Sequence, residues 1–284
     1  MSFHLIARPR NGWLALAELA LLIALFVGVQ FLIVIAAGLI NPELFIEFAD
    51  ADAAGPNDVF IIALSIIAPF VASWIAQRNP AGLVSVANRV RWRYVGVAAA
   101  VAVPVYGVLL VVDGISGGWT VTTSTLALVV AMVLVVPVQA ATEEFVFRAA
   151  IPQIVGNWLR PAWVAYGAGV LPFVFLHLYN VIGLVDIFIF ALCAAYLTWR
   201  SNGIEQAVVL HAASNTFVFI TQALRPDLVV TTDISWGETV LSAGLTVGVT
   251  AGIALLSRAK LRAASAPVAA PQLAPQLALV QHGE

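Results

Sequence analysis

Long apolar stretches, separated by short polar segments, run along almost the whole chain. Windows nearly free of charged residues cover 13–40, 59–76, 94–112, 121–142, 162–185, 187–199, 204–224 and 239–256. Because a bilayer core of about 30 Å requires about 20 helical residues, most of these windows are long enough to cross it. The window that begins at residue 187 is short, and we expect its helix to begin at Leu184. The pattern predicts an all-α fold, a polytopic transmembrane helical bundle of about eight spans.

The composition supports a membrane protein. Hydrophobic residues make up 62% of the 284 residues and charged residues 10%, whereas a soluble domain is roughly half apolar. The first window follows Arg8 and Arg10, but it is about twice as long as the apolar region of a signal peptide, so we interpret it as an anchor. The single cysteine, Cys193, excludes an intrachain disulfide.

The distribution of charge predicts how the spans are oriented. If the chain alternates across the bilayer, nearly all loop Lys and Arg residues fall on one side, and this excess marks the cytoplasmic side. Both termini are then cytoplasmic, and the protein is a multi-pass protein of the cell membrane. Acidic residues such as Asp113 and Asp186 fall on the opposite side. The eight tryptophans lie at or near predicted span ends, as expected of residues that favour the membrane interface.

Three charged residues interrupt an otherwise apolar region, namely Glu143, Glu144 and Arg148. Ionisable side chains in hydrocarbon cost several kcal/mol and are usually kept for a function. Residues four apart share one face of an α-helix, so Glu144 can pair with Arg148, while Glu143 is rotated by about 100° and can face a cavity. Glu143 is therefore a candidate general base. The structural alternative is an ion pair that only fixes helix packing.

Two histidines strengthen the functional interpretation. His177 and His211 are the histidines outside the terminal segments, where we expect His4 and His282 to be solvated. A single histidine in a span is usually a packing residue, but two histidines with two glutamates favour a site. His211 and Asn215 share one helix face, and their N–H groups could stabilise an oxyanion. Asn215 could instead form a hydrogen bond between helices.

A metal site is an open alternative. Glu143, His177 and His211 together could hold zinc and leave a position for hydroxide. The helical zinc signature H-E-x-x-H is absent from the sequence. A water activated by Glu143 and a water bound to zinc are both compatible with the residues.

These residues resemble the motifs of a known family. Residues 143–148 are similar to the E-E-x-x-x-R motif of the CPBP intramembrane proteases, also called the Abi or CAAX-protease family. Residues 173–177, from Phe173 to His177, resemble the family's F-x-x-x-H, and residues 211–215 resemble its H-x-x-x-N. The three motifs follow in the family's order and cover about residues 120–225.

The resemblance implies an endopeptidase, similar to the type II CAAX prenyl endopeptidases, that acts within the membrane on a lipidated or membrane-associated peptide or protein. It assigns Glu143 as the base that activates water, with His177 as its partner. His211 and Asn215 become the oxyanion donors, and Glu144 and Arg148 become supporting residues. The family's frequent description as metalloproteases implies zinc as a candidate cofactor. Membrane lipids are expected partners, and nothing indicates nucleic acid.

Two features depart from the family pattern. Ala149 stands where many relatives have glycine, which we expect to affect packing and not chemistry. In addition, His177 lies roughly 22 Å along the fifth window, whereas His211 lies roughly 10 Å into the seventh. The two would meet if the fifth helix began near Gly167, leaving residues 156–166 at the interface.

The predicted spans and motifs divide the chain into five segments. We expect a cytoplasmic segment at 1–12, N-terminal transmembrane helices at 13–119, and the catalytic core at 120–225. The last transmembrane helix and its basic flank follow at 226–262, and a disordered cytoplasmic tail at 263–284. The alternatives are a catalytically silent membrane immunity or interaction protein and a proton-coupled transporter.

Overall fold

The computed structural model describes residues 2–6, 11–43, 56–228 and 231–265, and most of these residues are helical. No strand is found among them, so the predicted all-α bundle is confirmed. The described elements are η1 (Phe3–Leu5), α1 (Gly12–Ile40), α3 (Pro56–Leu64), α4 (Ile67–Ile75), η2 (Pro80–Leu83), α5 (Trp92–Gly117), α6 (Thr123–Glu144), η3 (Phe145–Ala150), α7 (Ile151–Val155), α8 (Ala162–Phe175), α9 (Val181–Ser201), α10 (Glu205–Leu224) and α11 (Trp236–Ser265). Residues 266–284 of the expected tail lie outside the described residues.

Seven stretches of the described residues are long and apolar enough to span a membrane. They are Gly12–Ile40, Asn57–Ile75, Trp92–Gly117, Thr123–Val155, Val181–Ser201, Glu205–Leu224 and Trp236–Arg258. An eighth apolar helix, α8, has 14 residues. It is therefore shorter than the other seven, at about 21 Å.

The expectation of a single helix over 162–185 is wrong. The helix ends at Phe175, and α9 begins at Val181 after the side chain of Asn180 accepts a hydrogen bond from the Gly183 amide. Such a cap satisfies an amide that the first turn leaves without a partner. Asp186, expected in a loop, consequently lies inside α9.

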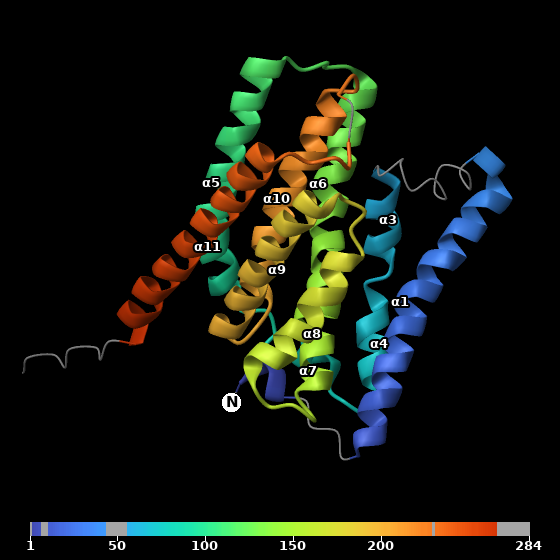
Figure 1. Ribbon diagram of the computed structural model, residues 1–284, viewed down its shortest axis with the longest axis vertical. Helices are drawn as coiled ribbons and strands as arrows, with labels where there is room; N and C mark the ends of the chain where they lie inside the picture. Colours follow the sequence, from blue (N-terminus) through green and yellow to red (C-terminus); the bar gives the residue numbers. More distant parts are fainter. Residues whose placement is uncertain (1, 7–10, 44–55, 229–230, 266–284) are drawn as a thin grey trace, which may run out of the picture.

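Helix α10 stands in the middle of the bundle. It packs most extensively on α6 and α5 and also on α9, while α11 covers α9 and α5. Figure 1 shows α10 and α6 side by side at the centre and α1 at one edge, diverging from the bundle toward one end. The site residues of α6 and α10 therefore face each other across the most closely packed pair of helices.

A buried ion pair attaches α1 to the rest of the bundle. Its acidic member lies within the apolar window 13–40, which is otherwise free of charged residues. Glu18 of α1 is 1% exposed, and its Oε1 lies 3.0 Å from Nη1 of Arg78. Nη2 of Arg78 donates to Oε1 of Gln153 in α7 at 2.6 Å, and Gln153 Nε2 donates to the Gly82 carbonyl. This network compensates the charge of Glu18, as burial of a carboxylate requires.

The N-terminal turn η1 is buried, which corrects the expectation that His4 is solvated. Phe3 is 1% exposed and His4 3%. His4 Nε2 lies 2.9 Å from the Arg160 carbonyl, and its ring contacts Tyr166 edge-on. The backbone of η1 packs so closely on Gly156 that a Cβ there would overlap the His4 carbonyl oxygen.

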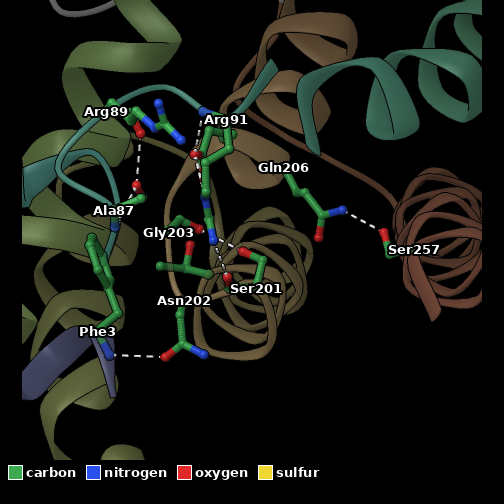
Figure 2. Close-up of polar contacts among 12 residues, drawn as sticks. Phe3, Ala87, Arg89, Arg91, Ser201, Asn202, Gly203, Gln206 and Ser257 are labelled. Atoms are coloured by element: carbon green, nitrogen blue, oxygen red, sulfur yellow. Dashed lines mark hydrogen bonds and ion pairs between the residues drawn. The ribbon is translucent and has the colours of Figure 1, made fainter. Parts of the chain in front are cut away.

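A second arginine joins the loop before α5 to the turn between α9 and α10 (Figure 2). The guanidinium of Arg91 donates to both carboxylate oxygens of Glu205, at 2.8 and 2.7 Å, and to the Ser201 carbonyl at 2.8 Å. Asn202, in the left-handed conformation at φ 56°, accepts a hydrogen bond from the Phe3 amide. Bidentate pairs of this kind fix geometry as well as charge, so the start of α10 is firmly positioned.

Candidate active site

The two glutamates are the last residues of α6. The helix begins with a capping box in which Thr122 and Thr125 satisfy each other's backbone amides. After Glu144 the backbone widens into a π-helical turn, η3, which carries Arg148. Such turns are rare and are frequent at functional sites. The close approach of α8 to this turn requires Gly169, because a Cβ there would lie 1.9 Å from the Phe147 carbonyl oxygen.

Glu143, Glu144, Arg148 and His211 form a buried quartet of ionisable side chains. Oε1 of Glu144 lies 3.3 Å from Nη1 of Arg148, as the spacing predicts, and 2.8 Å from Nδ1 of His211. Nε2 of His211 lies 3.3 Å from Oε2 of Glu143. The imidazole thus bridges the two carboxylates, and Glu143, 8% exposed, is the most accessible of the four.

Arg148 is completely buried, and its guanidinium nitrogens make no hydrogen bond to any of the described residues. Its guanidinium carbon lies 3.9 Å from the centre of the Phe173 ring. A cation over an aromatic face is stabilised by the ring, by about 2 kcal/mol when both are desolvated. The ion pair with Glu144 and this stacking are therefore what hold the arginine in the apolar interior.

Helix α8 begins at Ala162, so the expected start near Gly167 is wrong, and His177 lies two residues beyond the end of the helix at Phe175. Its Nδ1 lies 2.7 Å from the Phe173 carbonyl. The Phe173 ring packs against both imidazoles, with centroid distances of 4.7 Å to His177 and 6.0 Å to His211. His177 makes no direct contact with Glu143 among the described interactions, but it is close enough to interact with it electrostatically.

Asn215 lies one turn beyond His211 on α10 and contacts Gln139 of α6, which is not among the predicted site residues. Its Nδ2 donates to Oε1 of Gln139 at 3.2 Å. Gln139 is 5% exposed and precedes Glu143 by one helical turn on α6. The two amides therefore connect the faces of α6 and α10 that carry the ionisable residues.

The side chains do not fit the zinc site considered from the sequence. Among the described residues, no three His, Cys, Asp or Glu side chains converge as metal ligands. Both ring nitrogens of His211 are directed at carboxylates, and Nδ1 of His177 is directed at the Phe173 carbonyl. A zinc ligand set of Glu143, His177 and His211 would require these contacts to be exchanged.

Residues 122–217 match the protein family described as type II CAAX prenyl endopeptidase, Rce1-like. The match covers 96 of the 284 residues, 122 to 217, and supports the CAAX-protease family suggested by the motifs. The matched segment runs from the cap of α6 into α10 and includes all six predicted site residues. Comparison with curated proteins found no match, and comparison with solved structures found none.

The residues of this candidate site differ in how readily the sequence reveals them. The six predicted site residues are conspicuous because they are polar or ionisable residues in a largely apolar sequence. Gln139 carries no charge, and only its spacing of four residues from Glu143 could have drawn attention to it. Phe190 of α9 packs edge-on against His211 at a centroid distance of 4.9 Å, and nothing distinguishes it from other apolar residues of its span.

Proposed function

We propose that the protein is an intramembrane endopeptidase that hydrolyses a peptide bond with a water molecule activated by Glu143. The observation that carries the proposal is the contact of Glu143 with His211, which joins the carboxylate of one family motif to the imidazole of another. A buried carboxylate beside an imidazole is suited to proton transfer. The membrane spans around the site favour a substrate that is itself lipidated or membrane-associated.

In the proposed reaction, Glu143 removes a proton from water while the water oxygen bonds to the scissile carbonyl carbon. His177, whose Nδ1–H donates to the Phe173 carbonyl, accepts through Nε2 a hydrogen bond from the second O–H of that water, and this proton stays on the oxygen. The carbonyl oxygen becomes an oxyanion. The carbon–nitrogen bond then breaks, and Glu143 returns its proton to the leaving amine.

The oxyanion is stabilised from α10. The two proposed donors are the Nε2–H of His211, which would turn from Oε2 of Glu143 at 3.3 Å toward the oxyanion, and the second Nδ2–H of Asn215. Such donors typically contribute a few kcal/mol each. Glu144 and Arg148 hold the imidazole in place.

The proposal is tested by a cleavage assay in nanodiscs with fluorescence-quenched peptides, one farnesylated at a C-terminal CAAX sequence and one a plain transmembrane segment. We expect Glu143→Gln to lower kcat by on the order of a thousandfold, with similar losses for His211→Ala. The matched control is Glu43→Gln, an exposed glutamate outside the site, which should retain full activity.

Cleavage that persists at the wild-type rate in both site variants would remove the proposal. Cleavage of the plain segment but not of the farnesylated peptide would retain the peptidase and assign it to unlipidated substrates.

A further inference from the structure

The turn between α8 and α9, residues 176–180, carries His177. The amides of Leu176 and His177 donate to carbonyls of α8, and Nδ1 of His177 lies 2.7 Å from the Phe173 carbonyl, also in α8. These bonds tie the turn only to the helix that it follows. Within the described part of the chain, the hydrogen bonds that join this turn to a segment beyond α8 and α9 all come from Asn180.

Asn180 joins the turn to the segment between α10 and α11. Its backbone amide donates to the Thr232 carbonyl at 3.0 Å. Its Nδ2 donates to Oδ1 of Asp233 and, at 2.9 Å, to the Ile234 carbonyl, so both hydrogens of the side-chain amide are used. Its Oδ1 accepts from the Gly183 amide at 2.8 Å. One side chain thus caps α9 and holds a distant segment, and we call its contacts with residues 232–234 the Asn180 clamp.

Close packing surrounds the Asn180 clamp. A Cβ at Gly183 would lie 2.7 Å from Cβ of Tyr179 and 3.0 Å from Cγ1 of Ile234. The hydroxyl of Thr239, in the first turn of α11, donates to the Ile182 carbonyl at 3.3 Å. The segment before α11 is therefore seated on the first turn of α9.

His177 lies between two anchors along the chain. Phe173, four residues before it, is 1% exposed, packs against the imidazole and stacks on Arg148. Asn180 follows three residues after it. The Tyr179 ring also stacks on the imidazole, at a centroid distance of 6.3 Å, but it belongs to the same turn and would move with it. Without the Asn180 clamp, the imidazole would be held from α8 alone.

We propose that Asn180 is a positioning residue for His177. By holding the turn against residues 232–234, it sets the place of the imidazole beside the water of the proposed reaction. The inference rests on the proposed function for the role of His177, whereas the place of the imidazole can be measured without any cleavage. Because a misplacement of about 1 Å can cost up to about a hundredfold in rate, the clamp acts on kcat.

The substitution Asn180→Asp separates the clamp from the cap of α9. Aspartate caps a helix as well as asparagine does, but it lacks the two Nδ2 hydrogens, and its charge repels Asp233. Adding Asp233→Asn places an amide donor opposite the new carboxylate, so that donor and acceptor are exchanged. The matched control is Asn11→Ala, which removes the side-chain cap of α1 and lies outside the candidate active site.

The first measurement is the rate at which diethyl pyrocarbonate modifies each histidine of the purified full chain in nanodiscs, followed by mass spectrometry. We expect Asn180→Asp to speed the modification of His177 several-fold, while His4 and His211, 3% and 2% exposed, keep their wild-type rates. A general loosening of the fold would speed all three. The exchanged double variant should return His177 close to its wild-type rate.

The second measurement is cleavage of the farnesylated and plain peptides. We expect Asn180→Asp to lower kcat on the order of tenfold with KM unchanged, the exchanged double variant to recover most of this loss, and Asn11→Ala to retain full activity. If the wild type cleaves neither peptide, the proposed function fails, and the modification rates still decide whether Asn180 positions His177.

A wild-type modification rate of His177 in Asn180→Asp would overturn the inference, and so would an equal acceleration at all three histidines. Should Asn180→Asp not fold, Asn180→Ser takes its place under the same expectations, because serine also caps a helix and adds no charge.

Discussion

Arg148 has the largest side chain among the fully buried residues that the structure describes. Its role follows from the kinds of interaction that its guanidinium makes. Its guanidinium makes no hydrogen bond within the part of the chain that the structure describes, so its contribution is its charge beside Glu144 and its stacking on Phe173. Removal of one member of a buried pair leaves the other charge uncompensated, which typically costs 3–5 kcal/mol. The arginine is thus a structural counter-ion that the site cannot lose alone.

We therefore predict that Arg148→Met lowers the unfolding free energy by about 3 kcal/mol, measured by thermal unfolding in nanodiscs. The double variant Glu144→Gln with Arg148→Met should recover most of this loss, because no buried charge is left without a partner and the amide oxygen still accepts from His211. A double variant as unstable as the single one would contradict the role assigned to the arginine.

A second prediction at this scale concerns Gln139. If its carbonyl orients the amide of Asn215, Gln139→Leu should lower kcat about tenfold, which corresponds to one hydrogen bond, and leave KM unchanged. In an Asn215→Ala background the same change should have no further effect, because coupled residues are not additive. Fully additive losses would show that Gln139 acts independently of Asn215.

The sequence predicts some contacts of the site residues but not others. The Glu144–Arg148 pair follows from a spacing of four within one helix. The bridge that His211 makes to both glutamates does not follow, because it depends on how α10 is placed against α6. Glu18 was overlooked because one carboxylate barely changes the hydropathy of a long apolar window.

At the scale of elements, the π-helical turn η3 and its packing against α8 decide where Arg148 lies. Nothing in residues 145–150 distinguishes this turn from an α-helix by hydropathy, so a regular helix was the natural expectation. The break between α8 and α9 was also missed, because its polar residues, His177 and Asn180, are few among apolar ones. Both features depend on local backbone hydrogen bonds that apolar periodicity does not report.

Two glycines of α8 provide a matched test of this packing. Gly169→Ala should lower the thermal midpoint by several degrees and reduce cleavage, because its Cβ would overlap the backbone of η3. Gly167→Ala, where no atom lies within 4 Å of the added Cβ, should be neutral or slightly stabilising, since alanine favours a helix. Equal effects of the two substitutions would show that the contact with η3 is not tight.

For the whole molecule, the sequence predicted the class of fold because a bilayer imposes strict lengths on its helices. All eight tryptophans are exposed, between 39% for Trp119 and 80% for Trp163, as side chains that face the lipid interface should be. The arrangement of the spans was not predictable, because neighbouring helices in a membrane are selected by packing and by polar contacts such as Glu18–Arg78 and not by apolar periodicity.

The orientation of the bundle remains a prediction from its charges, and it can be measured. In a Cys193→Ser background, Val121→Cys in the loop between α5 and α6 should react with a membrane-impermeant maleimide added to intact cells. Val90→Cys, before α5, should react only after the membrane is permeabilised. Both positions are exposed, so the reverse pattern would mean that the chain is inserted the other way round.

The wide turn after Glu144 limits how the motif could be grafted onto another helix. A π-helical turn accommodates about one residue more than an α-helical turn, so everything that follows it is rotated by roughly 100°. On an uninterrupted α-helix the motif residues 143–148 would have the same sequence, but the helix after them would be rotated, and Gln153 would point away from Arg78. A designed scaffold must therefore reproduce the irregular backbone, and copying the side chains alone is insufficient.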